Sequence, residues 1–205
     1  MQTISARWPV VLGMLMLAAS RAPASAAEDM APRIVDCRIG FDGTFKVGHW
    51  TPVWVNVSGD VAAAKVSIEL TTIDSDGIEV TVSTAAGSDG PTLLTARIGR
   101  IGSAVQLKLV DEDGRLLDRA ELSARRGQEG GARYIALPST GELVVQIGPG
   151  ALGLAEVLAE QEADDDTIAS GFVQLTDVDA LPTAWFGYEA VDVLVLTTND
   201  IAFCE

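Results

Sequence analysis

The chain has 205 residues, and its 29 acidic against 14 basic side chains give a formal net charge of −15. An acidic surface repels nucleic-acid backbones and anionic lipid headgroups, so the composition argues against both as partners. With two cysteines, 20 glycines and 8 prolines, the sequence belongs to neither the disulfide-scaffold nor the fibrous class.

The first 26 residues have the three-part layout of a secretory signal peptide. Arg7 supplies the positive charge, residues 8–19 form a short apolar run, and Ala-Ser-Ala at 24–26 is a small-x-small cleavage site. We therefore expect an exported protein of the periplasm or cell envelope that starts near Ala27, with an uncleaved N-terminal anchor as the alternative. The later apolar runs have only strand length, so we expect no integral membrane span after cleavage.

Residues 27–132 are predicted to form an Ig-like β-sandwich, because short strands alternate with turn signals about every ten residues. Val53, Val55 and Val57 recur with the period of a half-buried strand. Asp76-Gly77 and Asp113-Gly114 are hairpin signals. Residues 41–50, which contain two glycines, are expected to be a turn. The expected strands cover residues 33–41, 51–59, 64–72, 78–83, 92–99, 103–110 and 115–123.

After a polar, glycine-rich stretch at 124–134, residues 133–205 are predicted to form a partial α/β domain of the Rossmann or flavodoxin-like class. Residues 142–148 and 192–198 are apolar runs typical of buried parallel strands, and residues 171–176 form another strand. Residues 151–161 have helical spacing. One helix covers one face of such a sheet at best, so apolar area is expected to stay exposed, to pack on the sandwich, or to await the rest of a longer gene product.

The apolar run at 142–148 leads into a G-x-G-x-x-G spacing at Gly148, Gly150 and Gly153. In dinucleotide-binding folds such glycines allow a tight turn and close approach of the backbone to a pyrophosphate, while an acidic residue such as Asp177 or Asp179 takes the ribose. The intervening proline removes a backbone donor and the acidic chain repels phosphate. We therefore expect a structural turn and no cofactor, and keep nucleotide binding as the alternative.

Two longer patterns carry a family resemblance. Residues 39–60, IGFDGTFKVGHWTPVWVNVSGD, resemble the first strands of Ig-like modules in bacterial surface proteins. Residues 181–196, LPTAWFGYEAVDVLVL, resemble part of a class I glutamine-amidotransferase-like domain. Together they resemble exported bacterial proteins, common in planctomycete-like genomes, that place such a domain after an Ig-like sandwich. The resemblance implies a fold and a compartment, with the chain as a truncated member. It implies no activity, because the catalytic elbow would lie beyond Glu205 and no histidine follows Cys204.

His49 is the only histidine, so a Ser/His/Asp or Cys/His catalytic set is not expected, and neither is a zinc site. The acidic turns at 74–79 and 111–114 lack the spacing of a calcium loop, which leaves no metal site. Cys37 is expected to be a buried free thiol, with a disulfide to Cys204 as the alternative.

The sequence thus predicts a non-catalytic exported protein with a structural or interaction role, whose partner is another protein or the rest of a longer gene product. Two alternatives stay open. One is a nucleotide-binding or amidotransferase-like enzyme or sensor fragment that uses the turn at Gly148 to Gly153. The other is a carbohydrate-binding sandwich, in which His49, Trp50 and Trp54 form the platform.

Overall fold

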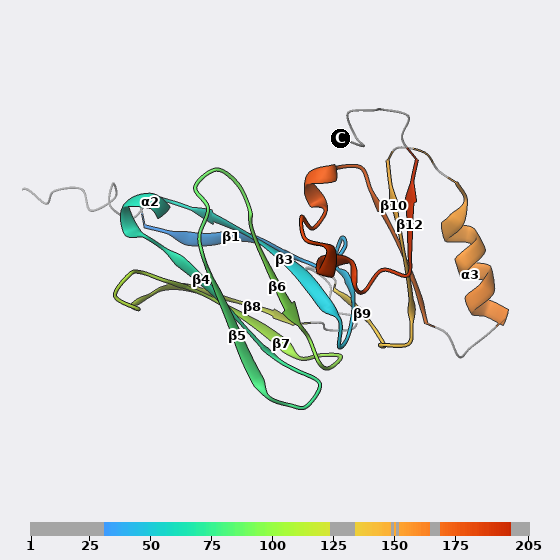
Figure 1. Ribbon diagram of the computed structural model, residues 1–205, viewed down its shortest axis with the longest axis horizontal. Helices are drawn as coiled ribbons and strands as arrows, with labels where there is room; N and C mark the ends of the chain where they lie inside the picture. The colour runs from blue at the N-terminus through green and yellow to red at the C-terminus, as the bar shows by residue number, and fades with distance from the viewer. Residues whose placement is uncertain (1–30, 124–133, 149, 151, 165–168, 198–205) are drawn as a thin grey trace, which may run out of the picture.

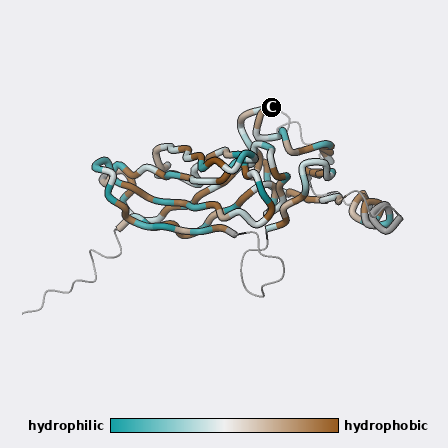
Figure 2. The backbone as a smooth tube through the Cα atoms, turned by 90° about the horizontal axis from the view of Figure 1, so that it is seen from below, coloured by the Kyte–Doolittle hydropathy of each residue, from teal (hydrophilic) through white to brown (hydrophobic). Residues whose placement is uncertain are grey.

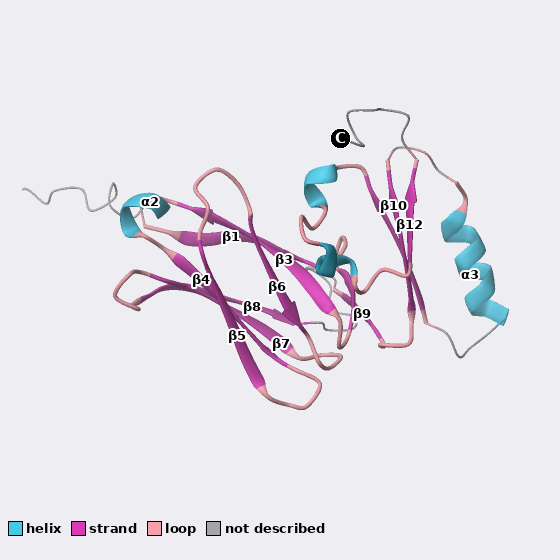
Figure 3. Cartoon of the chain, viewed as in Figure 1, coloured by secondary structure: helices cyan, strands magenta, loops and turns pink. Residues whose placement is uncertain are grey.

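The computed structural model describes residues 31–123, 134–148, 150, 152–164 and 169–197 (Figure 1). The described chain is mainly β. A sandwich of antiparallel sheets takes up the N-terminal part, and a smaller parallel sheet stands beside one end of it (Figure 3). The predicted signal peptide lies outside the described residues.

The seven strands expected for the sandwich all form, in two sheets whose neighbouring strands are antiparallel. The first sheet has three strands in the order β1-β3-β6: β1 (Arg33–Ile39), β3 (Trp50–Ser58) and β6 (Thr92–Arg97). The second has four in the order β5-β4-β7-β8: β4 (Ser67–Ile73), β5 (Glu79–Ala85), β7 (Ala104–Val110) and β8 (Leu116–Ser123).

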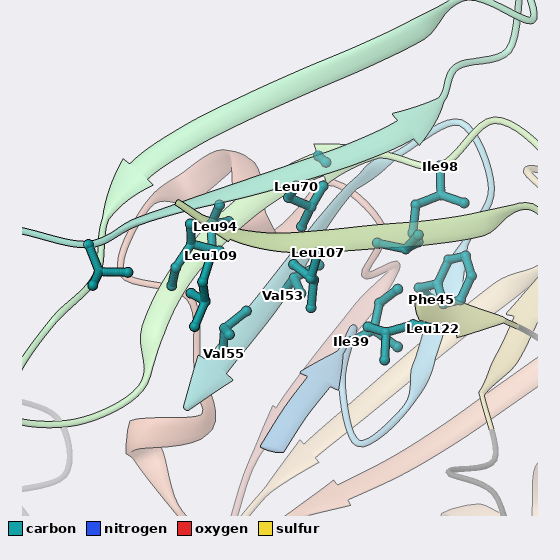
Figure 4. Packing of buried hydrophobic residues seen from close by; sticks show 14 of the residues in the cluster. Ile39, Phe45, Val53, Val55, Leu70, Leu94, Ile98, Leu107, Leu109 and Leu122 are labelled. Carbon is teal, nitrogen blue, oxygen red and sulfur yellow. The ribbon is translucent and has the colours of Figure 1, made fainter. Parts of the chain in front are cut away.

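The core between the two sheets consists mainly of aliphatic side chains at alternate positions of the strands, together with the ring of Phe45 (Figure 4). Val53 and Val55 of β3, for example, are both fully buried, as the alternation in the sequence predicts. The strand is not half-buried, however, because Trp54 on its other face is only 5% exposed. Seen at right angles to the first view, the two sheets form separate layers, and the helix of the parallel sheet lies at the far end of the molecule (Figure 2).

Both predicted hairpins form, and the same side-chain device closes each turn. Asp74 Oδ1 accepts hydrogen bonds from the amides of Asp76 and Ile78, at 2.9 and 2.8 Å. Asp111 Oδ1 does the same for the amides of Asp113 and Arg115, at 3.0 and 2.8 Å. These aspartates therefore act as turn residues.

Three short elements in or beside this half are absent from the sequence prediction. The expected turn at 41–50 contains β2 (Thr44–Lys46), which pairs in parallel with β9 (Ile135–Leu137) beyond the glycine-rich stretch. A one-turn helix, α2 (Val61–Ala64), precedes β4. Strand β9 also bridges the two halves, because Ala136 packs against the sandwich core and Leu137 belongs to the core of the C-terminal part.

The C-terminal part, called the tail below, is a parallel sheet in the order β11-β10-β12. Its elements are β10 (Glu142–Ile147), α3 (Leu154–Asp164), β11 (Ser170–Leu175), the 3₁₀ helices η1 (Val178–Ala180) and η2 (Trp185–Tyr188), and β12 (Val193–Leu196). Three strands and the single long helix among the described residues do not by themselves support a Rossmann-like or flavodoxin-like domain. The predicted strands are present, but the described chain as a whole is a β protein.

Apolar side chains of the tail stay partly uncovered, as expected for so small a sheet. Strand β12 lies at its edge, and Val193, Leu194 and Leu196 are 49%, 45% and 54% exposed. Because neighbouring residues of a strand point to opposite faces, β12 is open on both. The central strand β10 is buried instead, with Leu143, Val145 and Ile147 in the tail core.

Candidate functional site: an aromatic groove where the tail meets the sandwich

The tail core includes a residue of the sandwich half. Phe41, in the loop after β1, is 1% exposed and belongs to the cluster formed by β10, β11 and the segment before β12. Its ring centroid lies 6.1 Å from that of Tyr188 in η2. The sandwich thus supplies an aromatic side chain that the tail needs to fill its own interior.

An ion pair holds the two parts together beside this contact. The buried Lys46 of β2 donates to both carboxylate oxygens of Asp192, with Nζ–O distances of 3.1 and 2.9 Å. Asp192 Oδ2 also accepts from the amide of Leu143, at 2.7 Å. Burial raises the pKa of Asp192, but the Leu143 amide, Lys46 and, more weakly, the charge of His49 together outweigh burial, so the net shift is downward.

The 3₁₀ helix η2 packs on the outer face of the first sheet. The ring of Phe186 lies edge-on to Trp50, with 5.9 Å between the ring centroids. Glu189 accepts a hydrogen bond from the Trp50 amide at 2.8 Å and pairs with Arg97 at 3.3 Å. The Arg97 guanidinium lies 5.0 Å from the centre of the Trp50 ring. These contacts fix η2 against β3 and β6.

A groove of about 490 Å³ opens at this junction and is called the aromatic groove below. Strands β5 and β6 line one part of it, and the aromatic side chains of β3 and η2 line the rest. The lining residues are Trp50, Val82, Ser83, Thr84, Leu93, Leu94, Thr95, Trp185 and Phe186. None of them is charged. Trp185 is 85% exposed, which is unusual for the largest apolar side chain and suits a contact residue.

The structure separates the residues of the predicted tryptophan platform. Trp50 lines the groove, whereas Trp54 is only 5% exposed and lies 5.6 Å from the Arg38 guanidinium. His49 is not among the groove residues. Trp185 and Phe186 complete the aromatic wall instead. Sequence reasoning missed this role because it depends on η2 docking across the chain; the one available signal was an aromatic pair in a connecting segment.

The glycines of the predicted nucleotide turn follow the carboxyl end of β10. Backbone groups of two of them form hydrogen bonds within the chain. The Gly148 amide donates to the Leu175 carbonyl at 2.9 Å. The Gly150 carbonyl accepts from the side-chain amide of the buried Gln146. Gly153, with φ +68°, precedes α3. Asp177 caps η1 by accepting from the Asp179 amide at 2.9 Å. Nucleotide binding here stays a prediction, and these bonds favour a structural turn.

Cys37 is a half-buried free thiol on β1, and its predicted alternative partner Cys204 lies outside the described residues. The Tyr134 hydroxyl donates to the Cys37 carbonyl at 3.3 Å. Burial raises the pKa of Cys37, and the nearby Asp36 charge adds to the effect. The pKa of Tyr134 rises to about 12, again mainly through burial. A thiol with a raised pKa forms less of the nucleophilic thiolate at neutral pH.

The match to a known family covers only the sandwich. Residues 32–125 match the model of a domain of unknown function, DUF8726, which spans the strands from β1 to β8. No curated protein and no solved structure matches the chain. Among the helices of the described residues, none has the length and apolar character needed to cross a membrane.

Proposed function

We propose that the chain is a non-catalytic, exported interaction protein that binds its partner in the aromatic groove. The observation that carries this proposal is the groove itself, an uncharged hollow with the 85%-exposed Trp185 on its rim. Tryptophan, tyrosine and arginine dominate the energetics of protein interfaces, and apolar hollows near them are the usual anchor points. The signal-like layout of residues 1–26 supports the export part of the proposal.

The resemblance to exported proteins with an Ig-like sandwich and an amidotransferase-like domain is part of the same proposal. It rests on the sequence patterns at residues 39–60 and 181–196. Val193, Leu194 and Leu196 on the open edge strand would suit contact with further protein. We propose a binding role for the tail and no chemistry.

Photo-crosslinking in the producing cells tests the proposal. A benzophenone amino acid replaces Thr84, a groove residue on the same face of β5 as Val82, and in a matched chain it replaces Asp113, which is exposed at the tip of the β7–β8 turn. We expect one discrete adduct from position 84 that weakens when Trp185→Ala is added. Equal adducts from both positions, or none from position 84, would contradict the proposal.

A carbohydrate ligand is the second candidate, because an indole as exposed as Trp185 can stack on a sugar ring. Thr84 and Thr95 also line this groove, and their hydroxyl groups could bond to sugar hydroxyls. Titration of the purified chain against a panel of cell-wall glycans, followed by tryptophan fluorescence, tests this candidate. Saturable binding that Trp185→Ala removes would favour it over a protein partner.

A further inference from the structure

The two sheets of the sandwich have unequal numbers of strands. The sheet β1-β3-β6 has three, and the sheet β5-β4-β7-β8 has four. Val80 of β5 pairs with Thr72 of β4 and shares the core face with Leu70 and Val82, yet it is 41% exposed. A side chain on a core face is uncovered in this way when no strand lies opposite it. The first sheet therefore lacks a strand beside β6.

The free edge of β6 presents hydrogen-bonding groups, and their identity follows from the register. The Pro52 carbonyl accepts from Gly40, on the β1 side of β3, so Pro52 and its β6 partner Thr95 form a non-hydrogen-bonded pair. Bonding alternates along an antiparallel ladder, so Leu93, Thr95 and Arg97 all direct their amides and carbonyls away from β3.

Two contacts at the end of β6 agree with this assignment. The Arg97 carbonyl accepts from the Thr72 hydroxyl at 2.9 Å, away from β3. The Ile98 carbonyl accepts from the Gly48 amide on the β3 side, at 2.8 Å. The groups left at the free edge are the amides and carbonyls of Leu93 and Thr95. In the described part of the chain, no strand pairs with this edge of β6.

Leu93 and Thr95 are also residues of the aromatic groove. A strand laid beside them would cover Val82 and Thr84 with its inner side chains and would face Trp185 and Phe186 with its outer ones. A strand bound in the groove could therefore form main-chain hydrogen bonds to β6 and side-chain contacts with the groove residues at the same time. This combination is the requirement for adding a strand to a sheet edge.

The charges around the groove indicate which residue types would suit the two ends of such a strand. Glu79 is exposed at the start of β5, and Asp89 is exposed in the connection from β5 to β6. In the sequence they lie before and after the groove residues of β5, and Arg97, which lies over Trp50, is paired with Glu189, in a chain of net charge −15. An uncharged groove with these acidic side chains beyond it complements an apolar segment with basic residues on either side.

From these observations we infer that the aromatic groove takes up an extended segment of a partner protein as a fourth strand beside β6. The segment alternates apolar residues and carries basic residues at its ends. The inference rests on the proposed function, since it names the kind of partner that the groove binds. The partner backbone bonds to Leu93 and Thr95, and its side chains contact Val82, Trp185 and Phe186.

Selection of displayed random peptides on the full chain supplies the probe. We expect enriched peptides to alternate apolar residues between basic flanks, and a synthetic peptide of that sequence to bind. Thr95→Pro removes the amide that faces the partner and leaves the β3 ladder intact, because proline is tolerated at a strand edge. It should weaken the peptide by more than about tenfold, whereas the matched Thr95→Val, which keeps the amide, should not.

Hydrogen exchange in the unaltered chain gives a second readout that needs no variant. Bound peptide should slow exchange at the Leu93 and Thr95 amides and leave the Leu94 amide unchanged, since that amide already bonds to β3. If Trp185→Ala abolishes binding but Thr95→Pro and the edge amides are unaffected, the groove is an interaction site and strand addition is wrong. If no peptide is enriched, or only glycans bind, the inference is overturned.

Discussion

The sandwich and the tail show two ways to bury a small sheet. The sandwich core lies between its own two sheets, and Ile68, Leu70 and Leu107 in it are fully buried. The tail buries β10 but leaves β12 open on both faces, and it takes Phe41 from the sandwich half into its core. The sandwich therefore builds its core mainly from its own two sheets, whereas the tail depends on contact with the sandwich to complete its core.

The largest effect is expected from Phe41→Ala, which removes the sandwich residue from the tail core. Truncation of a buried phenylalanine costs about 3–5 kcal/mol of unfolding free energy. Limited proteolysis should then cut first within the tail, while the sandwich survives. As the matched control, Leu70→Ala in the sandwich core should expose the whole chain to protease. Uniform digestion of the Phe41→Ala chain would show that the sandwich does not stand alone, and an unchanged digestion pattern would show that the tail does not depend on this contact.

Asp192→Asn tests the ion pair that joins the tail to the sandwich. It leaves the buried Lys46 charge without its partner, and we expect a loss of about 1–3 kcal/mol. This is less than for a fully buried pair, because the Asp192 side chain is 43% exposed and water screens it. Denaturant unfolding at neutral pH measures the loss.

The same substitution should change the response to acid. The pKa of Asp192 is lowered in the folded chain, so its contribution is present above the unfolded value of about 3.8 and is lost as the pH falls below it. The unaltered chain should therefore lose tail stability in this range, and the Asp192→Asn chain should lose less. Parallel acid curves for the two chains would rule out this role for Asp192.

Gly148→Ala tests the turn after β10. Gly148 has φ +110°, and a Cβ there would lie 2.7 Å from the Thr197 hydroxyl oxygen, so we expect a cost of about 1–3 kcal/mol. Gly153→Ala is the control, because its Cβ would meet nothing closer than 3.8 Å and only the positive φ is strained. Thermal unfolding compares the two. Equal losses would mean that the contact with Thr197 is unimportant.

The smallest effect on stability is expected from Trp185→Ala. The side chain is 85% exposed, so its removal should change the unfolding free energy by less than about 0.5 kcal/mol. Partner binding should nevertheless fall strongly. A large loss of stability would assign Trp185 a structural role at the junction in place of a contact role.

The sequence predicts elements whose signals are local. The alternation of Val53 and Val55 and the turn at Asp76-Gly77 place the strands and a hairpin without reference to the rest of the chain. Strands β2 and β9 escape prediction because each has three residues and forms only by pairing with the other. The aromatic groove escapes it for the same reason, since Trp185 reaches β6 only after the tail has docked.

Native-state hydrogen exchange tests most directly the claim that the sandwich stands alone and the tail depends on it. The amides to compare are those of Leu107 in β7 and Val145 in β10, both at the centre of their sheets. In the unaltered chain we predict a lower opening free energy for Val145 than for Leu107, and in the Phe41→Ala chain a further drop at Val145 alone. Equal or greater protection of Val145, unchanged by Phe41→Ala, would contradict the account.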